Sequence, residues 1–177
     1  DIQKHVFIER NLMTPLLASR GESSGVIIRD RERSSVMINE EDHLRIQTYR
    51  TGFNLKAALA DVIKTGKILE ESLEFSYDDA YGYLTACPTN FGSGLRLSVL
   101  IHLPALVLTK EIQRVIRSAG QLGLAVRGYR GEGSDVVSNF FQISNQATMG
   151  KTEEEIEQGL VSTVGRIVDY EKKAADL

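Results

Sequence analysis

A short segment with a cysteine at one end and an arginine at the other has the composition of an active-site loop. Cys87 is followed by two glycines, Gly92 and Gly94, and then by Arg96 at the start of an apolar run. Glycines leave backbone N–H groups accessible, and a cysteine near arginines can be held as a thiolate by the positive surroundings. We interpret residues 87–96 as an active-site loop, although a lone cysteine is also a common buried small residue.

Three arginines have the placement expected of phosphate-binding residues. Arg96 opens an expected strand over 95–103 directly after the glycine loop, and Arg127 ends an expected strand before a second glycine-rich loop. Arg45 lies in a third polar segment. A guanidinium is planar, permanently charged and able to donate two hydrogen bonds to one phosphate, so this pattern favours phosphate binding.

The polar segment from Asn39 to Arg45 is unusually acidic. We expect it to continue a strand that begins at residue 34, because no glycine or proline interrupts it. Strand alternation then places Asn39, Glu41, His43 and Arg45 on one face, with Glu41 and Arg45 about 13 Å apart. One surface would then hold a cationic group at one end and an anionic group at the other. A solvated edge strand is the alternative interpretation.

These residues must be positioned by a mixed set of strands and helices. Residues 1–20 are expected to form a strand or turn followed by irregular backbone, interrupted by Pro15. Periodicity and turn residues predict the following strands and helices elsewhere. The strands are 25–28, 34–46, 73–77, 83–87, 95–103, 122–128 and 136–144, and the helices are 54–69, 106–119 and 152–172. The sum predicts an α+β fold, a largely antiparallel sheet flanked by helices.

The composition restricts the class of protein. A chain of 177 residues with 42% hydrophobic content can bury one sizeable core, so a single domain is expected. The net charge is -3, so the chain lacks the overall positive charge that favours binding to nucleic acid or to an anionic membrane. The single cysteine cannot form an internal disulfide, and no apolar run approaches the roughly 20 residues of a membrane span. We therefore expect a cytoplasmic protein. His5, His43 and His102 lack metal-ligand spacing, so no metal site built by the protein alone is expected.

Taken together, the polar segments resemble the catalytic-domain motifs of the phosphagen (guanidino) kinase family. The motifs occur in the family's order, and the similarity extends from about residue 5 to residue 172. The segments that carry it are 39–45, 87–96 and 127–132. The intervening segments most resemble the bacterial protein arginine kinase branch. They are 81–86, 102–106 and 142–146.

The resemblance implies that the γ-phosphoryl group of ATP is transferred to a guanidino nitrogen, with Mg²⁺ as cofactor. It assigns Glu41 to orient the guanidinium and help take its proton, Glu132 to a second acidic position, and Cys87 to a thiolate against the guanidinium. The residues that it assigns to the nucleotide are Arg45, Arg96 and Arg127 on the phosphates and His5 near the nucleoside. Such chemistry needs acids around a guanidinium and cations around the transferring phosphoryl.

For the protein as a whole, the resemblance implies ATP-dependent phosphorylation of arginine side chains in proteins. The implied partners are protein substrates bearing arginine, activator or repressor proteins of the stress response, and a second copy in a homodimer. No membrane and no direct nucleic-acid partner are expected. Residues 1–177 are expected to be one catalytic-domain portion that lacks the family's amino-terminal segment and any carboxy-terminal domain.

Two alternatives remain open from the sequence. One is a kinase of free arginine or another small guanidine, a reading that Arg130 favours because it resembles the residue of small-substrate arginine kinases. The other is a non-catalytic regulatory domain that keeps the fold.

Overall fold

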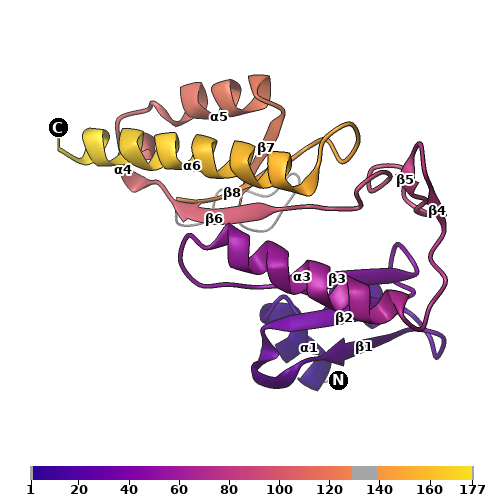
Figure 1. Ribbon diagram of the computed structural model, residues 1–177. Helices are drawn as coiled ribbons and strands as arrows, with labels where there is room; N and C mark the ends of the chain where they lie inside the picture. The colour runs from indigo at the N-terminus through magenta and orange to yellow at the C-terminus, as the bar shows by residue number, and fades with distance from the viewer. Residues whose placement is uncertain (1, 129–138, 177) are drawn as a thin grey trace. The chain divides into compact units, whose positions relative to one another are not determined.

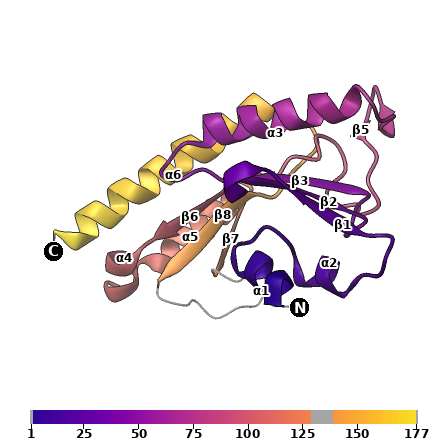
Figure 2. The ribbon, with the colours of Figure 1, turned by 90° about the horizontal axis from the view of Figure 1, so that it is seen from below.

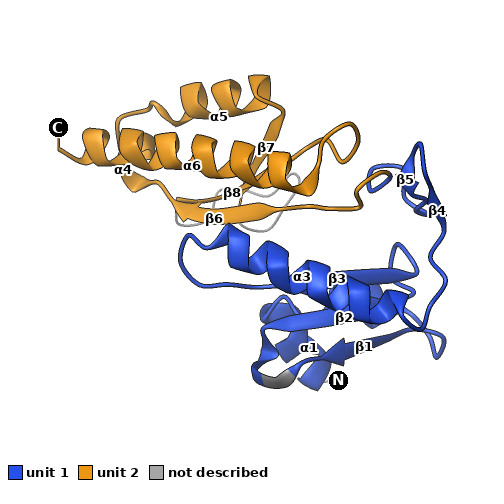
Figure 3. Ribbon diagram, in the orientation of Figure 1, with its two compact units in different colours: residues 1–91 blue, residues 92–177 orange. Residues whose placement is uncertain are grey.

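The computed structural model describes residues 2–128 and 139–176. The chain divides into two compact units, Asp1–Phe91 and Gly92–Leu177 (Figure 3). Among the helices in the described part of the chain, none has the length and apolar run needed to cross a membrane. Each unit contains its own sheet and its own covering helices.

Unit 1 is a three-stranded antiparallel sheet with helices on both faces. Its helical elements are α1 (Ile2–Glu9), α2 (Pro15–Ser19), the 3-10 turn η1 (Asp30–Glu32) and α3 (Leu55–Glu70). Its strands are β1 (Gly25–Ile28), β2 (Ser34–Ile38), β3 (Leu44–Thr48), β4 (Tyr77–Asp78) and β5 (Gly82–Tyr83). The sheet has the order β1-β2-β3, and β4 pairs with β5 in a separate hairpin. Helix α3 lies on one face of the sheet, and α1 and α2 lie on the other (Figures 1 and 2).

The register of unit 1 explains which side chains meet which helices. Val26, Met37 and Arg45 are directly opposite one another across the strands and therefore share a face. On this face Met37 is fully buried and packs with Met13 and Leu17 beneath the short helices. Arg45 therefore leaves the sheet on the side of α1 and α2.

The expectation of a strand or irregular backbone over residues 1–20 is wrong. Two helices form instead. Thr14 caps α2 by accepting the N–H of Leu17 at 3.1 Å, and Pro15 occupies the first helical turn, where its missing N–H costs nothing. Leu12 is fully buried between the helices, which anchors a segment whose local sequence has little helical periodicity.

The expectation of a continuous strand from residue 34 to residue 46 is also wrong. The chain turns back after Ile38, and Ile38 pairs with Leu44 across a β-hairpin. Asn39 adopts a left-handed conformation with φ 54°, and its N–H donates to the carbonyl of His43 at 2.9 Å, closing the loop. Asparagine tolerates this backbone better than most residues. The strand alternation and the 13 Å separation predicted for Glu41 and Arg45 therefore do not apply.

Unit 2 is a second three-stranded antiparallel sheet, covered on one face by helices. Its strands are β6 (Ser98–His102), β7 (Leu124–Gly128) and β8 (Phe140–Asn145), in the order β6-β8-β7. Its helices are α4 (Pro104–Leu108), α5 (Ile112–Gln121) and α6 (Glu153–Ala175). Helices α5 and α6 lie on the same side of the sheet in both views (Figures 1 and 2).

Several predicted elements of unit 2 are confirmed and one is divided. The capping box of Thr152 and Glu155 forms in full, and the apolar stripe of α6 is buried. The helix expected over 106–119 is two helices, because Lys110 between them has a left-handed φ of 62°. The α+β class and the antiparallel pairing are confirmed, with the described strands distributed over three sheets.

The strands predicted on either side of residues 78–82 are much shorter than expected. Only two residues pair on each side, and β5 ends at Tyr83. Cys87 therefore lies four residues beyond the strand that was expected to present it, in a segment without regular structure.

Replacing Gly92 with alanine is expected to destabilise the protein by about 1–3 kcal/mol, because Gly92 has a φ that side chains rarely adopt. The φ is 102°, and a Cβ there would lie 2.6 Å from the carbonyl oxygen of Thr148. Urea unfolding followed by circular dichroism measures the loss. The matched control is Gly120→Ala in α5, where a Cβ meets no atom within 4 Å. Equal unfolding free energies of the two variants would contradict the prediction.

Candidate functional site

The loop between β2 and β3 carries three consecutive acids, and the first is buried. The Glu40 side chain is 3% exposed and accepts hydrogen bonds from Thr14 Oγ1 at 2.6 Å and from the N–H of Glu41 at 2.9 Å. Arg45 Nη1 lies 3.4 Å from the same carboxylate, and Arg20 donates to the Glu40 carbonyl at 3.0 Å. Glu40 thus joins α2, the loop and β3.

These contacts decide the charge state of Glu40. Burial alone would raise its pKa, but the hydrogen bonds from Thr14 and from the Glu41 N–H, together with the charge of Arg45, outweigh it. The pKa of Glu40 is therefore held below its ordinary value of 4.5. A buried carboxylate with these partners remains ionised at neutral pH.

The second acid, Glu41, is exposed, while its backbone is fixed through its N–H to Glu40. The third acid, Asp42, reaches the Cys87 segment. Its Oδ1 accepts the N–H of Cys87 at 3.0 Å, and its Oδ2 accepts Nδ2 of Asn90 at 2.7 Å. The Glu41 loop and the Cys87 segment are thereby brought together within unit 1.

The Cys87 thiol itself is partly exposed in the described structure. Its Sγ lies 3.0 Å from Oγ1 of Thr89, and its carbonyl accepts from the hydroxyl of Thr85 at 2.6 Å. A turn closes where the N–H of Asn90 donates to the Cys87 carbonyl at 3.0 Å. An exposed carboxylate and a partly exposed thiol on adjacent segments are the groups needed to hold a guanidinium.

Two of the predicted arginines belong to unit 2. Arg127 lies in β7 opposite Gln142 of β8, which is in turn opposite Leu100 of β6, so the three share one sheet face. The apolar partners Ile143 and Phe141 are on the opposite face and are buried. Arg127 therefore projects from the face that the helices α5 and α6 do not cover.

Arg96 is held in place by the residues on either side of it. Asn145 accepts the N–H of Leu97 at 2.8 Å and donates to the carbonyl of Leu95 at 3.0 Å. Asn145 is itself buried, and the loop is further tied by Ser93 N–H to the carbonyl of Thr148 at 2.8 Å. The backbone at Arg96 is therefore fixed while its side chain is exposed.

The remaining predicted residues are less informative. His5 is exposed on α1, and Glu132, like Arg130, lies outside the described residues. Among the described residues, no group of three or more histidine, cysteine or acidic side chains is placed to hold a metal ion.

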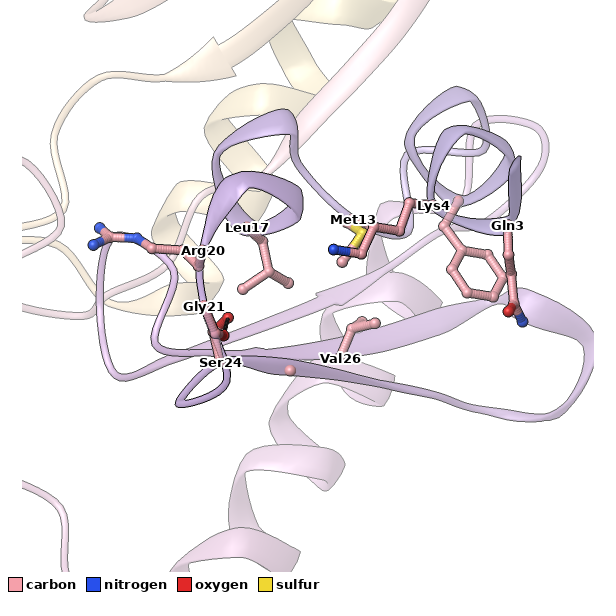
Figure 4. A pocket seen from close by; sticks show the side chains of 10 residues that line it. Gln3, Lys4, Met13, Leu17, Arg20, Gly21, Ser24 and Val26 are labelled. Carbon is pink, nitrogen blue, oxygen red and sulfur yellow. Dashed lines mark hydrogen bonds between the residues drawn. The ribbon is translucent and has the colours of Figure 1, made fainter. Parts of the chain in front are cut away.

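A pocket of about 260 Å³ is lined by residues of α1, of α2 and of β1 with the segment before it. Figure 4 shows Leu17, Met13, Val26, Lys4 and Arg20 among the residues that line it. Lys4 Nζ donates to the carbonyl of Ala18 at 3.1 Å, and Arg20 bonds the Glu40 carbonyl. Both cations thus tie the pocket walls to the surrounding backbone.

A comparison with protein families matches residues 1–174, across both units, to the model of the ATP:guanido phosphotransferase C-terminal catalytic domain. The chain belongs to this family. Relatives named protein-arginine kinase include one from Halothermothrix orenii, 45% identical over 177 residues, which cover 100% of this chain and 51% of the relative. One from Bacillus mycoides is 46% identical over 176 residues, covering 99% of this chain and 49% of the relative. The chain thus spans about half the length of the curated relatives that it matches.

Solved structures of the family share the fold. A lombricine kinase matches with a TM-score of 0.80 and 27% identity, over 97% of this chain and 50% of that one. A duplicated taurocyamine kinase from Schistosoma mansoni matches with a TM-score of 0.84 and 26% identity, over 97% of this chain and 25% of that one. The predicted family and its α+β fold are confirmed.

Sequence reasoning missed the two acids beside Glu41. A continuous strand would place Glu40 and Asp42 on the face opposite Glu41, whereas the loop gives each a separate set of donors. Pro88 and Asn90 were available as a sign of a turn after Cys87, because proline and asparagine are common turn residues, but they do not indicate its partner.

Glu40→Gln is expected to lower the unfolding free energy at neutral pH by about 1–3 kcal/mol, since a satisfied buried carboxylate is lost. Because the pKa of Glu40 is lowered on folding, its contribution is present above its ordinary value of 4.5 and is lost as pH falls through the folded-state pKa. The stability difference between the native protein and Glu40→Gln should therefore shrink as pH falls below 4.5. Urea titrations of both proteins across this range measure it, and a constant difference would contradict the assignment.

Proposed function

We propose that the whole protein is an ATP-dependent protein arginine kinase, which transfers the γ-phosphoryl group of ATP to arginine side chains of proteins. The observation that carries the proposal is the junction in unit 1, where Asp42 joins the Glu41 loop to the Cys87 segment. The junction joins the segment that carries an acid to the segment that carries a thiol, which supports a site for a guanidinium nucleophile.

At the guanidinium end, Glu41 orients the substrate and takes a proton as the nitrogen attacks phosphorus. A protonated guanidinium is a poor nucleophile, so a nearby base is needed. Cys87 lies against the guanidinium as a thiolate, and Glu132 supplies the second acidic contact. The exposure of Glu41 supports its access to a substrate, while the bond to Glu40 supports its fixed backbone.

At the phosphate end, Arg45, Arg96 and Arg127 bind the nucleotide phosphates, and His5 lies near the nucleoside. Magnesium sites at nucleotides use one or two carboxylates together with substrate phosphates, so no preformed cluster of protein ligands is needed. When bound, Mg²⁺ neutralises charge on the transferring phosphoryl. Arginines on fixed backbone provide the remaining positive charge.

The relatives named protein-arginine kinase support protein substrates that bear arginine. We further propose, from the family resemblance, that activator or repressor proteins of the stress response, a second copy in a homodimer and a cytoplasmic location belong to this protein. Residues 1–177 would serve as one catalytic-domain portion of it.

Glu41→Gln is expected to lower the rate of protein phosphorylation by about 10²–10⁴-fold, the range for loss of an acid–base group. Cys87→Ala is also expected to lower this rate, because the thiolate against the guanidinium is lost. Full-length protein is incubated with ATP, Mg²⁺ and an arginine-containing protein, and phosphoarginine is measured by mass spectrometry without acid treatment. Glu71→Gln, at the exposed C-cap of α3, is the matched control and should keep full activity. Absence of phosphoarginine with the unaltered full-length protein would overturn the proposal.

A small-guanidine kinase is the second candidate, because the structural neighbours include a lombricine kinase and a taurocyamine kinase. This candidate predicts ADP production with free arginine or a related guanidine and no modification of proteins. A non-catalytic regulatory domain predicts instead that the protein's cellular role survives both Glu41→Gln and Cys87→Ala.

Arg127→Ala is expected to raise the Kd for ATP about tenfold or more, because a charged hydrogen bond to phosphate contributes roughly 1.5–3 kcal/mol. Calorimetric titration of the full-length protein with ATP measures it, and Arg117→Ala, exposed on α5, is the matched control. The loss should diminish as salt is added, since the contact is ionic. Unchanged affinity for ATP in Arg127→Ala would remove this residue from the phosphate site.

A further inference from the structure

The segment that carries Cys87 is not held in place by the hydrogen bonds of a helix or a sheet. Residues 85–91, which surround Cys87, belong to no helix or strand in the described structure. Hydrogen bonds within the segment form the turn from Cys87 to Asn90, but they do not fix where that turn lies. A catalytic side chain must be held close to its productive position, so this turn needs an external anchor.

Asp42 supplies contacts to both ends of that turn. One carboxylate oxygen accepts the N–H of Cys87, and the other accepts the side-chain amide of Asn90, at 3.0 and 2.7 Å. These partners are 45 and 48 residues away in the sequence. Two bonds from two oxygens fix the orientation of the turn as well as its position, because rotation about either bond breaks the other.

Asp42 also follows Glu41 directly, on a loop whose backbone is fixed by Glu40. The side chain of Asp42 thus links the Cys87 segment to the Glu41 loop, and it is the contact that sets where the one lies relative to the other. We infer that Asp42 is a positioning residue, which sets the Cys87 segment against the Glu41 loop through Asn90 and the Cys87 N–H. The inference rests on the proposed function for its catalytic consequence, although the junction itself does not.

The identity of the side chains makes a specific prediction. An aspartate at position 42 offers two acceptors, which match one N–H and one amide NH₂. Asn90→Asp would set two carboxylates against each other and open the junction. In the exchanged pair, which is the double variant Asp42→Asn with Asn90→Asp, the amide oxygen at position 42 accepts the Cys87 N–H and the amide NH₂ at position 42 donates to the carboxylate at position 90. The exchanged pair should therefore form the junction again.

The test uses full-length protein and two independent measurements on Asp42→Ala, Asn90→Asp and the exchanged pair. The first is steady-state transfer to an arginine-containing protein, together with the Kd for ATP. The second is the rate at which iodoacetamide alkylates the Cys87 peptide, followed by mass spectrometry without any substrate. Asp61→Ala, which removes an aspartate paired with Arg50 in unit 1, is the control for a general loss of stability.

Asp42→Ala and Asn90→Asp are expected to lower kcat about 100-fold, the scale for a misplacement of 1 Å, with the Kd for ATP unchanged. Alkylation of Cys87 should become several-fold faster, because the turn is released and the thiol is more accessible. The exchanged pair should recover most of both properties, and Asp61→Ala should change neither.

Unaltered alkylation and kcat in folded Asp42→Ala protein would overturn the inference. It would also be overturned if kcat and ATP binding fell together, in step with unfolding, while alkylation of the folded fraction stayed the same. If the unaltered protein transferred no phosphate, the proposed function would fail, and the alkylation rates with the exchanged pair would still decide whether Asp42 holds the turn.

Discussion

The buried carboxylate of Glu40 is the interaction on which the candidate site of unit 1 depends. A carboxylate removed from water is costly unless hydrogen bonds and opposite charge replace its hydration. Here a hydroxyl, a backbone N–H and a guanidinium do so, and they come from α2, from the loop and from β3. The observed path of the loop gives the charge these three partners. The conformation of the loop is therefore determined by the charge of Glu40 as well as by the backbone hydrogen bond that closes the turn.

The consequence of this constraint is that three consecutive acids have three different surroundings. Glu40 is buried, Glu41 is exposed, and Asp42 is used by the Cys87 segment. A strand would have placed the outer two acids on one face and Glu41 on the other, so that Glu40 and Asp42 would have shared one environment. The left-handed Asn39 and the five-residue loop remove that equivalence. An exposed acid on a fixed backbone is thus obtained without exposing the neighbouring charges.

Helices could be predicted from the sequence where the segment itself contains the capping residues and the apolar stripe that stabilise it. Helix α6 has a capping box and a buried stripe, and α3 has Asn54 as its N-cap, so both were predicted closely. The predictions are wrong where contacts with residues far away in the sequence determine the backbone conformation. Residues 39–43 contain no glycine or proline to interrupt a strand, and only the contacts of Glu40 with Thr14 and Arg45 and the hairpin register show why they turn. Likewise, Cys87 is positioned by Asp42, a contact between residues 45 apart that no local pattern records.

The same dependence explains how Arg45 can both support the loop and bind a phosphate, as proposed. Its guanidinium is half exposed and lies 3.4–3.5 Å from the Glu40 oxygens, longer than the bonds from Thr14 and the Glu41 N–H. A long, partly solvated contact leaves guanidinium N–H groups for an incoming phosphate. If Arg45 turned toward that phosphate, Glu40 would keep its two shorter bonds, and the Glu41 backbone would stay fixed. The Glu40 carboxylate would then contact both Arg45, the candidate phosphate-binding residue, and the N–H of Glu41, the candidate guanidinium-binding residue. A movement of the Arg45 side chain would not displace the Glu41 backbone.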